Sequence, residues 1–259
     1  MKAVIWHGPG DVRYEEKAIP SICEDEVLIK VAYTGICGSE IHIIDGHLPV
    51  SRIAPPQVLG HEFSGTIAQL GQNVTDFKIG DRVTAHPWVG CGECHYCRQA
   101  QEHFCTNPFN VLSNPRAGSW AEYTAVKAKQ VYSLPQEMSL EIAALVEPFS
   151  IGLHAMDISN IRAGYSAVVL GAGVIGLACL QVAQRVGATL TIVSDLSDSR
   201  LELARKLGAD IVVNPSRRNL RDAVLEATGG LGVHTCIEAV GVKATCEAVS
   251  YTHLTLPTN

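Results

Sequence analysis

The stretch SAVVLGAGVIGLACLQVAQRVGATLTIVSDLSDSRLELARKLGADIVV, residues 166–213, decides the fold of the carboxyl-terminal part of this 259-residue chain. Its apolar and polar residues alternate in an order that predicts strand, glycine turn, helix, strand, helix and strand. The apolar run at 167–183 is shorter than the roughly 20 residues of a membrane span and is followed by Gln184 and Arg185. We therefore expect a buried strand that leads into a buried helix, as part of a parallel sheet covered by helices.

Three glycines in the first turn of this stretch, Gly171, Gly173 and Gly176, form the pattern G-x-G-x-x-G. The pattern follows a predicted strand and begins a predicted helix, which is the context of a dinucleotide-binding turn. In that turn Gly171 allows the sharp bend, Gly173 lets a pyrophosphate approach the helix N-terminus, and Gly176 lets helix and strand pack closely. We assign Val174 and Ile175, between the last two glycines, to the same cofactor-binding turn.

An aspartate, Asp195, ends the next predicted strand, about 20 residues beyond the glycine motif, where a carboxylate accepts hydrogen bonds from a ribose. Its negative charge would repel the 2′-phosphate of NADP, so the sequence predicts NAD as the cofactor. The alternative role for Asp195 is that of a helix N-cap, which Ser197 could fill instead. We place Arg200 over the adenine side or the ribose of the cofactor.

Charge and composition exclude several classes of partner. A net charge of −6 argues against nucleic acid, because duplex binding needs a basic face. The amino end, MKAVIWHGPGD, holds no apolar run of signal-peptide length. We therefore expect a cytoplasmic protein with no membrane partner, in a reducing environment that disfavours disulfides.

The stretch GCGECHYCRQAQEHFC, residues 90–105, gathers four cysteines with the spacing C-x2-C-x2-C-x7-C. Four thiolates this close together can surround one tetrahedral zinc ion, and they leave no position open for water or substrate. The alternative, a loop of free thiols, is less consistent with this spacing. We therefore predict a structural zinc site whose ligands are Cys91, Cys94, Cys97 and Cys105.

A second group of chemically active residues lies upstream. The segment GICGSEIHIIDG, residues 35–46, supplies Cys37, Ser39 and His42, and VLGHEFSG, residues 58–65, supplies His61 and Glu62. Thiolate, imidazole and carboxylate are the ligands of a catalytic zinc, which keeps one position open. Because neighbouring side chains on a regular strand face opposite sides, His61 and Glu62 could reach one ion only if the backbone there is irregular.

The order of GICGSEIH, GHEFSG, GDRV, the four-cysteine segment, GSWAEY, VEPFSIGLHA and GAGVIG resembles the medium-chain zinc-dependent alcohol dehydrogenases, within them the polyol, butanediol and threonine dehydrogenase branch. The resemblance implies an α/β chain: a GroES-like, β-rich catalytic domain at 1–150, with its structural zinc lobe at 90–106, and an incomplete Rossmann doubly wound parallel sheet at 151–247.

The resemblance also implies roles for the upstream residues. Cys37, His61 and a carboxylate would hold the catalytic zinc, and Ser39 with His42 would relay a proton to solvent. Alcohol dehydrogenases proper would place a cysteine near position 147, whereas this sequence has Glu147, which points to the polyol branch. Two alternatives remain open: Glu62 binds zinc directly, or Glu62 and Glu147 share the position through water.

The function implied is an oxidoreductase that transfers a hydride from a small polyol or secondary alcohol to NAD, with two zinc ions per chain, one catalytic and one structural. By the same resemblance we expect intact relatives to be homo-oligomers. The alternative is a catalytically inert zinc-binding fragment, because we expect the sheet to end after the fourth of six strands. Residues 248–259, AVSYTHLTLPTN, look like a non-native tail.

Overall fold

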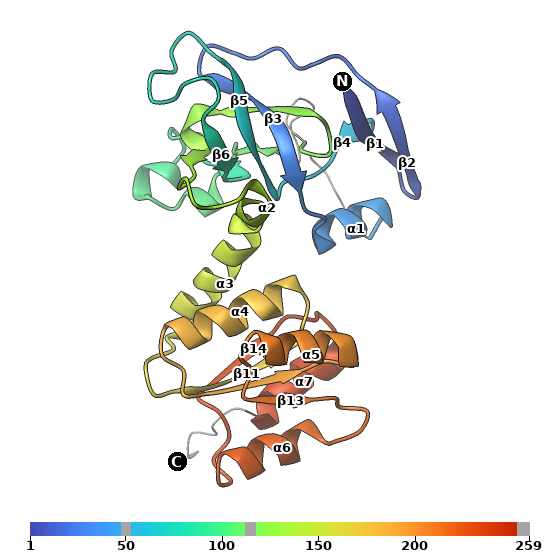
Figure 1. The fold of residues 1–259 in the computed structure, drawn as a ribbon, viewed down its shortest axis with the longest axis vertical. Coiled ribbons are helices and arrows are strands. Elements are labelled where there is room, and N and C mark those ends of the chain that lie inside the picture. The colour runs from blue at the N-terminus through green and yellow to red at the C-terminus, as the bar shows by residue number, and fades with distance from the viewer. Residues whose placement is uncertain (48–52, 112–117, 253–259) are drawn as a thin grey trace. The chain divides into compact units, whose positions relative to one another are not determined.

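The computed structural model describes residues 1–47, 53–111 and 118–252. The chain divides after Glu147 into two compact units (Figure 1).

The first unit is built from antiparallel sheets. A three-stranded sheet has the order β2-β1-β4, and a five-stranded sheet has the order β10-β6-β5-β3-β9. Their strands are β1 (Lys2–Gly8), β2 (Asp11–Glu16), β3 (Glu26–Thr34), β4 (Gln57–Val58), β5 (Phe63–Leu70), β6 (Arg82–Ala85), β9 (Tyr123–Lys127) and β10 (Val131–Ser133). Residues of β3 and β5 dominate the core, where Ile29, Phe63 and Ile67 are almost completely buried. This unit is the β-rich domain that the motifs predicted.

Short helices and turns connect these sheets. Helix α1 (Gly38–Ile44) follows β3, and helix α2 (Leu140–Ala143) begins at Ser139, whose hydroxyl accepts a hydrogen bond from the Ile142 N–H. A small hairpin of β7 (Trp88–Val89) and β8 (Phe109–Asn110) encloses the four-cysteine segment. The described residues of this unit also include the 3-10 turns η1 (Cys97–Gln99), η2 (Glu102–Phe104) and η4 (Ala128–Gln130).

The second unit contains a parallel sheet of four strands in the order β13-β12-β11-β14. The strands are β11 (Ser166–Leu170), β12 (Leu190–Ser194), β13 (Ile211–Val213) and β14 (Thr235–Glu238). The helices are α3 (Val146–Ser159), which begins in the first unit, α4 (Val174–Arg185), α5 (Asp198–Lys206), α6 (Leu220–Ala227) and α7 (Lys243–Thr252). The chain moves outward from β11 to β13 and then returns to place β14 on the other side of β11. This reversal of strand order is typical of a doubly wound sheet, as predicted.

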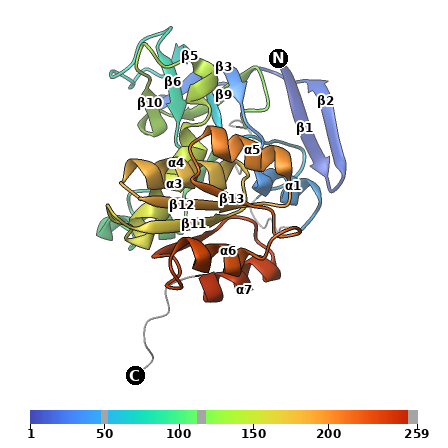
Figure 2. The ribbon, with the colours of Figure 1, turned by 60° about the horizontal axis from the view of Figure 1, so that its bottom comes forward.

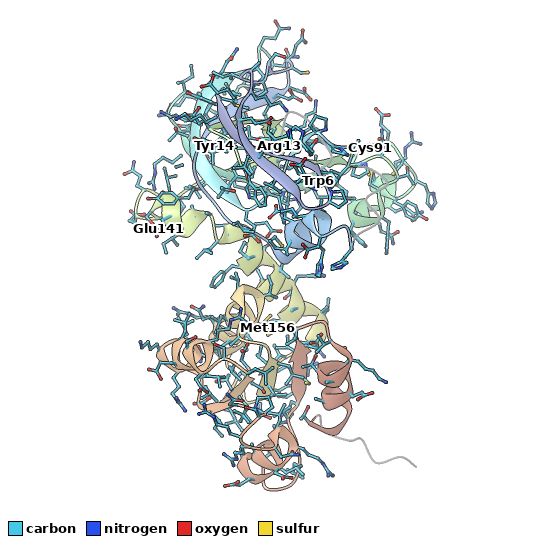
Figure 3. The ribbon with its side chains drawn as sticks, turned by 90° about the vertical axis from the view of Figure 1, so that its right-hand side faces the viewer. Trp6, Arg13, Tyr14, Cys91, Glu141 and Met156 are labelled. Carbon is cyan, nitrogen blue, oxygen red and sulfur yellow. The ribbon has the colours of Figure 1, made fainter. Side chains whose placement is uncertain are left out.

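Helices cover both faces of this sheet (Figure 2). Val169 and Val193 belong to a buried cluster with residues of α4 and α5, and Met156 of α3 (Figure 3) joins them. Their strand neighbours Val168 and Ile192 pack on the opposite face, in a cluster with residues of α6 and α7. Because successive strand residues face opposite sides, a sheet covered on both faces needs the nearly continuous apolar runs seen in the sequence.

Residues 248–252, which we set apart as a tail, form the second half of α7. Ala248 is only 6% exposed and packs in the cluster beneath α6. The remaining residues of the proposed tail, 253–259, lie outside the described part of the chain. Within the described residues, every helix is either too short or too polar to cross a membrane.

Candidate functional site

The backbone that carries His61 and Glu62 is irregular, as a shared site requires. Gly60 has φ +96°, and β5 begins only at Phe63. A Cβ atom on Gly60 would overlap Trp120 Cδ1 and lie 2.8 Å from the Trp120 backbone nitrogen. Only glycine fits this conformation and this close approach. The two residues after Gly60 therefore precede the regular strand and are free of its alternation.

Cys37, His61 and Glu62 converge at this point, with one ligand atom from each lying within 4.8 Å of the others. His61 and Glu62 are each 7% exposed, and Cys37, which caps the N-terminus of α1, is partly buried. A thiolate, an imidazole and a carboxylate in this arrangement can hold zinc and leave a fourth position open. The donor atoms present therefore suit the zinc ion that the motifs implied.

Glu147 lies outside this three-residue group. It occupies the first turn of α3 and is partly buried. Burial raises the pKa of Glu147, and the positive charge of His61 opposes this shift. Burial likewise raises the pKa of Glu62, again against the charge of His61. Both carboxylates thus interact electrostatically with His61, but only Glu62 reaches the three-ligand cluster.

Glu40 is a residue that the sequence reasoning missed. Its side chain is completely buried, its Oε1 lies 2.7 Å from His61 Nδ1, and its Oε2 accepts a hydrogen bond of 2.7 Å from the Cys37 backbone N–H. A carboxylate at Nδ1 favours the tautomer with the proton on Nδ1, which leaves Nε2 free to bind a metal. One signal was available: Glu40 stands three residues after the N-cap Cys37, the spacing of a capping box.

The protonation of His61 is set by the same neighbours. Burial by itself lowers the pKa of His61, but hydrogen bonds to Cys37 and Glu40 outweigh it and raise the pKa to about 10. A metal ion binding at Nε2 must therefore displace a firmly held proton.

Ser39 and His42 lie on α1, three residues apart. Residues at this spacing share one face of a helix. Ser39 is partly buried and His42 is exposed. The ring of His42 lies 6.1 Å, centroid to centroid, from that of His47.

The four cysteines of the lobe, where Figure 3 labels Cys91, also form one cluster, with their sulfur atoms within 4.8 Å of one another. Cys91 Sγ and Cys97 Sγ are 3.9 Å apart, as are Cys94 Sγ and Cys105 Sγ. A tetrahedron of ~2.3 Å zinc–sulfur bonds has edges of about 3.8 Å, so this spacing fits one ion. Backbone N–H groups of Cys97 and Thr106 lower the pKa of Cys94 to about 6, which favours the thiolate that zinc needs.

The glycine turn of the second unit has the geometry of a pyrophosphate site. Gly171 has φ +99°, and a Cβ atom on Gly176 would overlap the Gly171 carbonyl oxygen. Gly173 is the N-cap of α4, and apart from its chain neighbours no described residue has an atom within 4 Å of where its Cβ would be. The helix N-terminus is therefore open to an anion. Val174 and Ile175 form the first turn of the helix.

Asp195 joins this turn to the start of α5. Its Oδ2 accepts a hydrogen bond of 2.8 Å from the Ala172 N–H, and its Oδ1 accepts one of 2.8 Å from the Ser197 N–H. The N-cap of α5 is Ser197 itself, so the helix-cap alternative for Asp195 does not hold. Arg200 Nη1 lies 3.7 Å from Asp195 Oδ2, and its side chain is exposed. Each carboxylate oxygen keeps a lone pair for a ribose hydroxyl.

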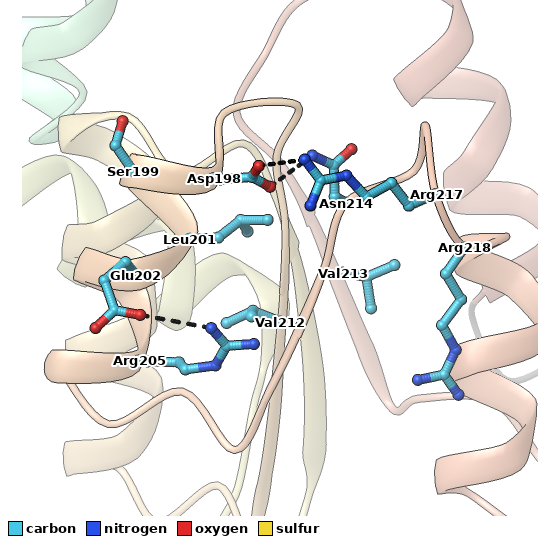
Figure 4. Close-up of a pocket in the computed structure, with 10 residues that line it drawn as sticks. All are labelled: Asp198, Ser199, Leu201, Glu202, Arg205, Val212, Val213, Asn214, Arg217 and Arg218. Carbon is cyan, nitrogen blue, oxygen red and sulfur yellow. Dashed lines mark hydrogen bonds and ion pairs between the residues drawn. The ribbon is translucent and has the colours of Figure 1, made fainter.

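A groove of about 590 Å³ lies between α5 and the loop after β13 (Figure 4). All three of its arginines are paired with carboxylates: Arg217 with Asp198 at 2.5 Å, Arg205 with Glu202 at 3.5 Å, and Arg218 with Glu226 at 2.6 Å. Its floor is apolar, with Val212 and Leu201. The groove therefore offers no unpaired arginine for a phosphate group.

Comparison with known proteins places these features in one family. The sequence family of the alcohol dehydrogenase GroES-like domain matches residues 23–136, and the family of zinc-binding dehydrogenases matches residues 174–253. The second match extends into the segment 248–259 that we set apart as a tail.

Similar proteins include the sorbitol dehydrogenase of Bacillus subtilis (strain 168), which is 35% identical over 96% of this chain and 70% of its own length. The D-arabitol-phosphate dehydrogenase of Enterococcus avium is 39% identical over 93% of this chain and 69% of its own length. A protein from Sinorhizobium meliloti 1021, solved with bound NADP, has a TM-score of 0.92 and 34% identity and covers 98% of this chain and 73% of its own. The chain belongs to the zinc-dependent medium-chain dehydrogenases, the family of alcohol and polyol oxidoreductases that its motifs predicted.

Proposed function

We propose that this protein oxidises a secondary hydroxyl group of a small polyol and transfers the hydride to NAD, with Cys37, His61 and Glu62 as the ligands of its catalytic zinc. The observation that carries the proposal is the convergence of these three side chains within 4.8 Å, two of them almost fully buried. The similar proteins are named for sorbitol and D-arabitol phosphate, which supports a polyol substrate.

Zinc held at this site would act as a Lewis acid that lowers the pKa of an alcohol hydroxyl towards neutrality. The residues of this chain provide the rest. Glu40 keeps the His61 proton on Nδ1 and thereby directs Nε2 to the metal. Ser39 and His42 accept the proton that the alcohol releases and carry it to solvent, because His42 lies exposed one turn along α1 from Ser39.

Of the two carboxylates, we propose Glu62 as the direct ligand and Glu147 as an outer residue. Glu62 belongs to the three-residue cluster, whereas Glu147 lies outside it and interacts electrostatically with His61. The other arrangement, in which Glu62 and Glu147 would share the position through a water molecule, stays a prediction.

The preference for NAD rests on Asp195. Its two hydrogen bonds to backbone N–H groups hold the carboxylate beside the glycine turn, where it can accept from a ribose hydroxyl and repel a 2′-phosphate. The similar protein from Sinorhizobium meliloti was solved with NADP. In this chain the discrimination against NADP is assigned to the negative charge of Asp195.

The four-cysteine lobe would hold the second, structural zinc, since four thiolates close its coordination shell. A reducing, cytoplasmic setting stays a prediction. A homo-oligomeric state stays a prediction.

The proposal is tested by measuring zinc content and NADH formation with sorbitol as substrate. The parent protein should bind two zinc ions, and Cys37→Ser should bind one and lose at least about a thousandfold in turnover, because only the open site activates the alcohol. The Cys246→Ser variant is a matched control, since Cys246 is exposed and outside both clusters. Equal turnover in Cys37→Ser and parent would refute the ligand assignment.

A further inference from the structure

Gly35 lies between β3 and the ligand Cys37, and its backbone is held on both sides. Its N–H donates a hydrogen bond of 2.7 Å to the Glu62 carbonyl oxygen. Its own carbonyl oxygen accepts a hydrogen bond of 3.0 Å from the indole Nε1–H of Trp120. The segment that leads to Cys37 is thus tied directly to the segment that carries His61 and Glu62.

The space beside Gly35, where other residues carry Cβ, is filled by the side chain of Glu62. A Cβ atom on Gly35 would overlap Glu62 Oε2 and lie 3.1 Å from Glu62 Cβ and 3.2 Å from Glu62 Cδ. The reason for glycine here is therefore space and not backbone conformation, because Gly35 is not among the residues with positive φ. An alanine would fit the backbone but would collide with the carboxylate.

We propose that Gly35 is a positioning residue, whose missing side chain lets the Glu62 carboxylate lie beside Cys37 and His61. The inference rests on the proposed role of Glu62 as a zinc ligand. The atom that an added methyl group meets first, Glu62 Oε2, is the end of a flexible side chain, so the methyl group displaces the carboxylate, while Glu62 Cβ at 3.1 Å needs to give only slightly. A substitution at Gly35 therefore changes the zinc site more than the fold.

Trp120 supports the same arrangement from the other side. Its Nε1–H holds the Gly35 carbonyl, and its Cδ1 fills the space beside Gly60, the residue before His61. One indole ring thus contacts both segments that deliver the ligands. Since Trp120 is partly buried and packs against Leu59, its position is fixed by the core.

The chain provides a matched control in Gly38. It directly follows Cys37, whereas Gly35 lies two residues before Cys37. Apart from its chain neighbours and the backbone of α1, no described residue has an atom within 4 Å of where a Cβ on Gly38 would be, and Gly38 also lacks a positive φ. Gly38→Ala thus adds the same methyl group near the same ligand without meeting Glu62.

The test measures the zinc affinity of the catalytic site by competition with a chelator in the full chain, with the lobe zinc as an internal measure of folding. Gly35→Ala should weaken this affinity by roughly 10–100-fold, as expected for a residue that orients a ligand. It should also change the visible spectrum of cobalt bound at the site. Gly38→Ala should stay within about twofold of the parent.

A double-mutant cycle identifies the cause. Glu62→Ala removes the group that the methyl would displace, so adding Gly35→Ala to it should change the affinity by no more than about twofold. Parent-like affinity in Gly35→Ala, or a full further loss in the Glu62→Ala background, would overturn the inference alone. If Glu62→Ala itself binds zinc as the parent does, the ligand assignment in the proposed function fails, and the inference fails with it.

Discussion

His61 Nδ1 lies 2.7 Å from Glu40 Oε1, in the interior of the first unit, where the Glu40 side chain is fully buried and that of His61 is 9% exposed. The other oxygen of Glu40 holds the Cys37 backbone N–H. One buried carboxylate therefore orients two of the three proposed zinc ligands. A charge this deeply buried is stable only with such partners.

Replacing this carboxylate tests its role. Glu40→Gln keeps the size of the side chain but removes the charge that stabilises the Nδ1 proton. The zinc affinity of the catalytic site should fall roughly 10–100-fold. Chelator competition measures this loss, and Glu141→Gln, a change at an exposed glutamate of α2, serves as the control. An unchanged affinity in Glu40→Gln would show that His61 is oriented by other contacts.

The pKa of His61 predicts how pH affects the zinc-depleted protein. The pKa of about 10 for His61 in the folded protein lies above the ordinary value of 6.5 for a histidine. The protonated imidazole therefore stabilises the fold fully below about pH 6.5, and this contribution, on the order of a few kcal/mol, is lost as the pH rises through about 10. The melting temperature of the zinc-depleted protein should fall across this range. In His61→Gln, the part of the decrease in melting temperature that is due to His61 should disappear. Identical plots of melting temperature against pH for the parent and His61→Gln would contradict the prediction.

The lobe zinc should stabilise the first unit. Cys97→Ser removes one of four thiolates and opens a closed site, so both zinc content and melting temperature should decrease, because structural zinc contributes directly to folding free energy. Metal analysis and thermal melting check this, with Cys246→Ser as the thiol control. Two zinc ions per chain and unchanged melting in Cys97→Ser would count against a structural metal.

Asp195 should control the choice of cofactor. Asp195→Ser removes a ribose acceptor and a negative charge together, and it also frees the Ala172 and Ser197 N–H groups. NAD affinity should fall roughly 10–100-fold, the range expected for hydrogen bonds to a charged group, and the discrimination against NADP should weaken. Titration with both cofactors measures the change, and Asp222→Asn, at an exposed aspartate of α6, is the control. If the ratio of the two affinities is the same in Asp195→Ser and the parent, another residue makes the choice.

Much of the fold was predictable because its signals are local. Gly171, Gly173 and Gly176 act within one turn, and their roles follow from the positive φ of Gly171 and from the close approach of the Gly171 carbonyl to Gly176. The four cysteines of the lobe lie within 15 residues, so their spacing alone brings the sulfurs together. The apolar runs of the parallel strands indicate that both faces of the sheet are buried, and they can be recognised without knowing which helices cover those faces.

The sequence by itself determined which residue types could form the catalytic site, and the tertiary structure decided how they meet. Cys37 and the His61–Glu62 pair come from segments that are separated in the chain, and their convergence depends on the left-handed Gly60 and on Trp120. The contacts of Glu40 with His61 and of Gly35 with Glu62 correspond to no periodic pattern in the amino-acid sequence. Only the pairing of β3 with β5 brings these segments side by side, and their distances depend on that register and on the irregular backbone before β5, neither of which a local pattern encodes.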